Sequence, residues 1–121
     1  MTEDLKDIIM TEFSNLYSEC LAGFSIGNGW LQEVYNLSKE ISENFPDIKI
    51  LQVKEKFGDL RIYYAPYSDT ADQMIQNTET ACSKICEQCG SKIEVHKSGK
   101  FWTKTLCKFH REEQKRHDDK Y

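Results

Sequence analysis

The sequence predicts an α+β protein in which helices pack on a short antiparallel β-hairpin and a zinc-ribbon-like element follows. Three observations predict this fold. Apolar residues recur at helical spacing in three segments, one segment alternates as two strands around a tight turn, and four cysteine and histidine residues form two close pairs. The 121 residues divide into an α+β domain, residues 1–85, and a zinc-ribbon-like element with a charged helical tail, residues 86–121.

Composition is that of a soluble globular protein, since 39% of the residues are hydrophobic and 30% are charged. The formal net charge of −4 argues against attraction of the whole chain to DNA or RNA, although a local basic patch stays open. No apolar run is long enough for a transmembrane helix and no signal-peptide pattern is present, so we expect a cytoplasmic protein. In that reducing compartment, five cysteines favour metal binding over disulfides.

The first half of the chain predicts two helices. Residues 3–22 place apolar side chains on one helical face, and Cys20 lies on that face as a core residue. Three glycines within residues 23–29 end this helix and predict a loop. The second helix is expected from Trp30 to about Asn44.

The segment Gly27-Asn28-Gly29 directly before Trp30 allows two interpretations. Backbone amides at the start of a helix attract anions, and Trp30 would then stack on a base. In the structural interpretation, the glycines form a tight corner and Trp30 begins the buried stripe of the second helix. The glycine pair alone does not decide between them.

Residues 48–57 and 60–64 are predicted as the strands of a hairpin with a Gly58-Asp59 turn. This register creates an apolar core face, which Leu51 joins, with three cross-strand pairs: Phe57 with Leu60, Glu55 with Ile62, and Val53 with Tyr64.

The other face of the hairpin is predicted to carry polar and basic side chains: Gln52, Lys54, Lys56, Arg61 and Tyr63. Lys56 and Arg61 would lie directly opposite each other, which is destabilising unless an anion lies between them. These residue types suit a phosphate or carboxylate attached to a planar group. The alternative is an ordinary solvated sheet face that Glu55 or Asp59 partly neutralises.

A third helix is expected from Ser68 or Asp69 to about Ile85, with Cys82 packed on its apolar face. Two short strands, residues 92–96 and 100–104, should follow it. The charged tail, residues 108–121, is predicted to be a solvated helix.

The metal-ligand pattern is Cys86-x2-Cys89, then seventeen residues, then Cys107-x2-His110. Gly90 gives the first pair the freedom that a tight zinc knuckle needs. Four ligands of this kind predict one structural Zn²⁺ with no position left for water. His96, between the pairs, is expected at the surface. Since no nucleophile-base pair, paired carboxylates or open metal site stands out, an enzyme is the least expected class.

Three segments resemble a family of small phage and prophage proteins: residues 27–30 (Gly-Asn-Gly-Trp), 52–64, and the metal-ligand segments 86–90 and 102–110. The resemblance covers most of the chain from about residue 27 to residue 110, and the middle segment, with its QVKEKFG-x-LR pattern, is the most specific. It implies an accessory protein with a zinc-knuckle tail in the cytoplasm of an infected or lysogenic bacterium. It implies no reaction.

We therefore expect a non-enzymatic protein that binds a small anionic ligand such as a nucleotide, thereby sequestering a host nucleotide signal. The expected ligand-binding residues are Lys54, Lys56, Arg61 and Tyr63, with help from Gln52 or Trp30. The alternative is an interaction module whose zinc element docks a host protein or, less expected, a nucleic acid through Phe101-Trp102. A homodimer that completes the site across an interface stays open.

Overall fold

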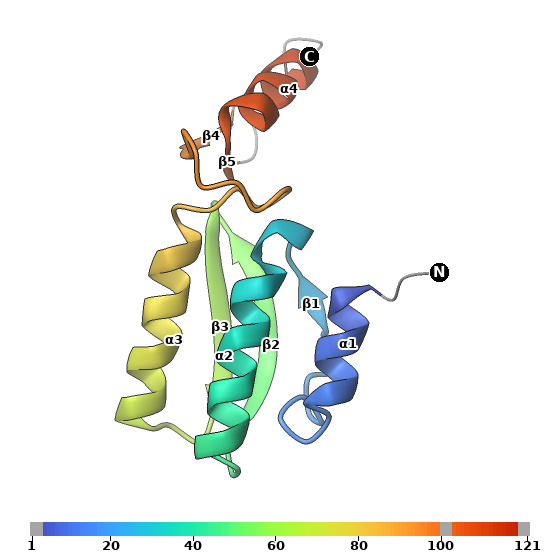
Figure 1. The fold of residues 1–121 in the computed structure, drawn as a ribbon, viewed down its shortest axis with the longest axis vertical. Helices are drawn as coiled ribbons and strands as arrows, with labels where there is room; N and C mark the ends of the chain where they lie inside the picture. Colours follow the sequence, from blue (N-terminus) through green and yellow to red (C-terminus); the bar gives the residue numbers. More distant parts are fainter. Residues whose placement is uncertain (1–3, 100–102, 119–121) are drawn as a thin grey trace.

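The computed structural model describes residues 4–99 and 103–118 and confirms the prediction of an α+β fold. The described residues form four α-helices, a three-stranded sheet in the order β1-β2-β3, and a two-stranded sheet, β4-β5. Helices α2 and α3 lie side by side along one face of β2 and β3 (Figure 1). The two-stranded sheet and α4 form a separate end of the molecule, beyond one end of β2 and β3 (Figure 1).

Helix α1 spans Leu5–Glu12, so the prediction of a helix over residues 3–22 is wrong in its second half. Residues 13–19 form turns instead. The reason is tertiary, because the carbonyl oxygen of Leu16 accepts a hydrogen bond of 2.9 Å from the backbone N–H of Ile50. The helix therefore ends before Leu16, whose backbone pairs with the sheet instead.

The predicted loop after α1 contains a two-residue strand, β1, Phe24–Ser25. This strand pairs parallel with β2 and places Ser25 beside Lys54. A 3-10 turn, η1, Asn28–Trp30, then leads into α2, Leu31–Asn44. The apolar stripe of α2 is buried, at Leu31, Val34, Leu37 and Ile41.

Strands β2, Lys49–Lys56, and β3, Asp59–Ala65, pair antiparallel in a register that differs from the predicted one. The turn consists of Phe57 and Gly58, whose φ angles are 53° and 85°, rather than of Gly58 and Asp59. From Gln52 to Lys56, each residue of β2 therefore pairs with a β3 residue two places earlier than predicted, and these side chains keep their faces.

All three predicted core pairs and the opposition of Lys56 and Arg61 are consequently wrong. Glu55 pairs with Leu60, Val53 with Ile62, Lys56 with Asp59, and Lys54 with Arg61.

Two side chains expected in the core lie at the surface instead. Phe57 is 73% exposed because it occupies the turn, and Leu51 is 37% exposed because it lies at a bulge in β2. Ile50 takes the buried position opposite Tyr64. Val53, Leu60 and Ile62 are buried, as their alternation predicts.

Helix α3, Asp69–Cys82, begins at the predicted cap, since the Ser68 hydroxyl accepts a hydrogen bond of 3.3 Å from the Ala71 backbone N–H. Its buried residues are Ala71, Ile75 and Cys82. They join the main core, which packs α1, α2 and α3 with the three-stranded sheet.

The C-terminal element comprises β4, His96–Ser98, β5, Lys104–Leu106, and α4, Lys108–Asp118. The two strands pair antiparallel, at positions after those predicted. A hydrogen bond of 2.8 Å from the indole N–H of Trp30 to the Ile85 carbonyl oxygen holds the start of this element to the main core. Among the described helices, none has the length and apolar character to cross a membrane.

Candidate metal centre and basic sheet face

The first pair of predicted metal ligands lies in a tight turn after α3. The backbone N–H of Gly90 donates to the Cys86 carbonyl oxygen at 2.9 Å, and the Cys86 N–H donates to the Ser91 carbonyl oxygen at 2.8 Å. Gly90 has a φ of 80°, a left-handed conformation that glycine adopts without steric cost. The turn therefore has the knuckle geometry that brings Cys86 and Cys89 to one point.

The second pair lies where β5 ends and α4 begins. Cys107 precedes the helix, and its carbonyl oxygen accepts a hydrogen bond of 2.8 Å from the backbone N–H of Arg111. Positions three residues apart at a helix start share one face, so Cys107 and His110 point together.

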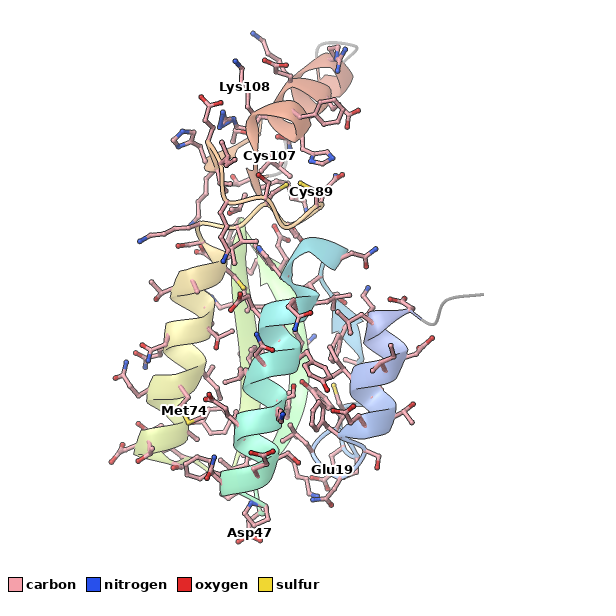
Figure 2. All side chains as sticks on the ribbon, viewed as in Figure 1. Glu19, Asp47, Met74, Cys89, Cys107 and Lys108 are labelled. Carbon is pink, nitrogen blue, oxygen red and sulfur yellow. The ribbon has the colours of Figure 1, made fainter. Side chains whose placement is uncertain are left out.

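The four side chains converge, and their ligand atoms all lie within 4.8 Å of one another. His110 Nδ1 is 3.5 Å from Cys86 Sγ and 3.3 Å from Cys107 Sγ, while Cys89 Sγ is 3.8 Å from Cys107 Sγ. Figure 2 shows Cys89 and Cys107 close together at the base of α4. All three cysteines are free thiols, so these four residues could hold one metal ion.

Hydrogen bonds from backbone amides favour the thiolate form of Cys86. Burial raises the pKa of its thiol, but hydrogen bonds from the backbone N–H groups of Cys107, Cys89 and Gln88 outweigh burial and lower this pKa to about 7. The thiolate is the form that binds metals, so the local backbone favours metal binding.

The other two cysteines belong to the core. Cys82 is fully buried and Cys20 is 6% exposed. Burial raises the pKa of both thiols, that of Cys82 to about 12. These thiols remain protonated and take no part in the cluster of Cys86, Cys89, Cys107 and His110, and both are core residues as expected, although Cys20 lies outside α1.

Glu87, a residue that the sequence did not single out, joins the candidate metal centre to the glycine-rich loop. It is only 5% exposed. Its carboxylate accepts a hydrogen bond of 2.9 Å from the Gly27 backbone N–H, and its carbonyl oxygen accepts one of 2.6 Å from the Gly29 N–H. The Lys104 ammonium lies 3.8 Å from the same carboxylate and 3.5 Å from that of Glu55. No local sequence pattern marks Glu87, because its partners Gly27 and Gly29 lie about 60 residues earlier in the chain.

The glycine-rich loop and Trp30 therefore support the turn that carries the candidate ligands Cys86 and Cys89. The Gly27 amide, which could have attracted an anion, holds the Glu87 carboxylate. A Cβ atom on Gly29 would lie 2.0 Å from the Cys86 carbonyl oxygen, so only glycine allows this approach. Trp30 has no exposed surface, so its ring offers no face on which a ligand could stack.

The other predicted ligand-binding residues lie together on the sheet face opposite α2 and α3, called the basic face below: Gln52, Lys54, Lys56, Arg61 and Tyr63. Lys54 lies opposite Arg61, and Gln52 lies opposite Tyr63. The Lys54 ammonium is 5.9 Å from the centre of the Tyr63 ring, a cation–π contact. The Arg61 side chain is 43% exposed and available to a ligand.

Asp59 neutralises part of the basic face. Its carboxylate contacts the Lys97 ammonium at 2.5 Å and, more weakly, the Arg61 guanidinium at 3.4 Å. Lys97 comes from β4, so the C-terminal element adds a positive charge at the edge of the face. Arg61 and Lys97 thus share one carboxylate, and Lys56 lies opposite Asp59 across the sheet.

A groove of about 790 Å³ lies between the glycine-rich loop and α4. Its lining includes Lys104 and the metal-ligand candidate His110, but also the acidic residues Glu87 and Glu113. This mixed charge attracts an anion less than the basic face does.

Two further expectations concern the segment between the ligand pairs. Phe101-Trp102, the expected anchor of an interaction module, lies outside the described residues. His96 is exposed, as predicted, and takes no part in the cysteine and histidine cluster.

Comparison with known proteins identifies no relative. No protein-family model, curated protein or solved structure matches the chain. The function is therefore inferred from the site itself.

Proposed function

We propose that this protein acts by binding, with a structural zinc ion in its C-terminal element and a small phosphate-bearing ligand, such as a nucleotide, on its basic face. One observation carries the proposal, namely the direct opposition of Lys54 and Arg61 on an open sheet face. Like charges at a cross-strand pair are destabilising by up to about 1 kcal/mol. An anion bound between them would remove this cost.

Zinc is favoured by the distances within the cysteine and histidine cluster. Zn–S bonds of about 2.3 Å and Zn–N bonds of about 2.0 Å give a tetrahedron with S···S edges of about 3.8 Å and S···N edges of about 3.6 Å. The cluster has an S···S distance of 3.8 Å and S···N distances of 3.5 and 3.3 Å. Three thiolates and one imidazole form a closed structural set, and the two pairs flank antiparallel strands as in a zinc ribbon.

On the basic face, different side chains would contact different parts of the ligand. Arg61 offers a planar fork that can grip two phosphate oxygens, and Lys54 adds a point charge beside it. Tyr63 supplies an aromatic surface, and Gln52 opposite it supplies both a hydrogen-bond donor and an acceptor. In the phage or prophage setting that the sequence resemblance implies, such binding would sequester a host nucleotide signal.

Isothermal titration with ADP and with inorganic pyrophosphate tests this proposal. Wild-type protein should bind both, and Arg61→Ala should weaken both by about tenfold or more, the size of a charged hydrogen bond. Arg61→Lys should restore binding only in part, because lysine lacks the planar fork. The matched control is Arg111→Ala, since this arginine bonds to the Glu94 carbonyl oxygen on the C-terminal element.

Three results would contradict the proposal. Wild-type protein would bind neither compound, Arg61→Ala would bind both as wild type does, or Arg111→Ala would weaken binding as much as Arg61→Ala.

The melting temperature of Arg61→Ala should stay near that of wild type. This substitution loses a weak, half-exposed contact with Asp59 but also relieves the repulsion with Lys54.

A second candidate function is the docking of a host protein or a nucleic acid by the C-terminal element. The exposed apolar side chains of Ile93 and Phe109, 74% and 60% exposed, favour it. A gel shift with DNA and RNA at two salt concentrations would detect the nucleic-acid form of this function. Phe109→Ala should then weaken the shifted complex, whereas Arg61→Ala should not.

A further inference from the structure

Phe57, in the turn between β2 and β3, combines two features that do not favour folding. Its side chain is 73% exposed, so its ring buries little apolar surface. Its φ of 53° lies in the left-handed region, which is strongly disfavoured for a bulky side chain and suits glycine or asparagine. Such combinations cluster at ligand-binding sites, where the strain is maintained by the surrounding structure.

The turn that carries Phe57 is held from both sides. The Glu55 carboxylate accepts a hydrogen bond of 2.9 Å from the Gly58 backbone N–H. The Thr105 hydroxyl donates one of 2.5 Å to the Gly58 carbonyl oxygen. Because neighbouring backbone groups are fixed in this way, the ring of Phe57 is presented to solvent in a preorganised position.

The ring also borders the basic face. The Lys56 ammonium lies 6.0 Å from the centre of the Phe57 ring, and Lys56 pairs across the sheet with Asp59. Along β2, Lys56 lies about 7 Å from Lys54 at the usual rise of an extended chain, and Phe57 follows Lys56 directly in the turn. A nucleoside diphosphate can bridge that span.

We propose that Phe57 stacks on the planar base of a nucleotide whose phosphates lie between Lys54 and Arg61. This inference rests on the proposed function and narrows its ligand to compounds that carry both phosphate and an aromatic base. Phe57 takes the stacking role that Trp30 cannot fill from inside the core.

The experiment compares ADP with inorganic pyrophosphate by isothermal titration in three variants. Phe57→Leu keeps an apolar side chain and the left-handed backbone but removes the ring. It should weaken ADP binding about tenfold, as expected for one base–aromatic stack, and leave pyrophosphate binding unchanged. Phe57→Asn should weaken ADP binding similarly and raise the melting temperature, since asparagine tolerates this φ. The control is Tyr67→Leu, an aromatic residue that is 70% exposed elsewhere, which should change neither titration.

Unchanged ADP binding in Phe57→Leu would overturn the inference, as would an equal loss of pyrophosphate binding. A lower melting temperature of Phe57→Asn would overturn the argument from backbone strain. The same titrations distinguish failure of this inference from failure of the proposed function. If Arg61→Ala weakens both compounds while Phe57→Leu weakens neither, only the stacking role is wrong, whereas a wild-type protein that binds neither compound would refute both.

Discussion

The hydroxyl of Thr105 donates a hydrogen bond of 2.5 Å to the carbonyl oxygen of Gly58, and both residues are buried. This bond joins β5 of the C-terminal element to the turn between β2 and β3. The Thr105 carbonyl oxygen also accepts a hydrogen bond of 3.0 Å from the Glu87 backbone N–H, beside the first metal ligand. A single strand residue thus connects the metal-binding turn with the tip of the hairpin, and we expect the two to become ordered together.

Thr105→Val should destabilise the protein by about 1–3 kcal/mol, because it leaves the buried Gly58 carbonyl oxygen without this donor. Valine has nearly the same shape, so packing should change little. The control is Thr103→Val, on the same segment, because the Thr103 side chain forms no hydrogen bond with any residue that the structure describes. Urea denaturation measures both variants, and equal stability of Thr105→Val and wild type would contradict a supporting role for this bond.

Gly29→Ala should displace the metal-binding turn, since the added Cβ would meet the Cys86 carbonyl oxygen at 2.0 Å and the Gly90 backbone nitrogen at 2.6 Å. Both are backbone atoms, so no side-chain rotation can relieve the contact. We expect a loss of stability of several kcal/mol, on the scale of severe overpacking, and lower metal affinity. Gly23→Asn is the control, because this position has open space and a left-handed φ that asparagine tolerates. Normal metal content and stability of Gly29→Ala would show that the loop does not support the turn.

Glu79 should make stability depend on pH. It accepts a hydrogen bond of 3.1 Å from the Ile62 backbone N–H. Burial raises the pKa of its carboxyl group above the ordinary value of 4.5, despite this bond and the nearby Arg61, which lower it. A raised pKa in the folded state means that folding takes up protons. The resulting stability is present below the unfolded pKa and is lost as pH rises through the folded pKa.

Wild type should therefore gain stability relative to Glu79→Gln as pH falls from neutral toward the unfolded value of 4.5. Urea denaturation of the two proteins at each pH gives the difference, in which effects of other groups cancel. A difference that stays constant, or that changes in the opposite direction, would contradict the assignment.

Cys107→Ser should lower the metal content well below one ion per chain and destabilise the C-terminal element, since it removes one of four ligands. Cys82→Ser should keep the full metal content, although it places a hydroxyl in the core. Metal analysis of the purified variants, with their melting curves, checks both expectations. Equal metal content in Cys107→Ser and wild type would remove Cys107 from the ligand set.

Local patterns were sufficient to predict part of this structure. The spacing of Cys86, Cys89, Cys107 and His110 predicts their convergence, because ligands two residues apart reach one point from a tight turn. Helical periodicity and the Ser68 cap predict α3 in the same way.

The errors occur where distant segments decide the local conformation. The turn falls on Phe57 and Gly58 because Glu55 and Thr105 hold Gly58 from either side, and Thr105 is 47 residues away from it in the chain. The role of Trp30 depends on the Ile85 carbonyl oxygen, 55 residues later. Alternation could assign the faces of β3 and of β2 from Gln52 onward, but it could not determine the bulge at Leu51 or where the turn begins.

X-ray absorption at the zinc edge of the purified protein tests the central claim most directly, that Cys86, Cys89, Cys107 and His110 hold one zinc ion. We expect one zinc per chain with three sulfur ligands at about 2.3 Å and one nitrogen ligand at about 2.0 Å. A folded protein that contains no zinc, or zinc surrounded mainly by oxygen or water, would contradict the account.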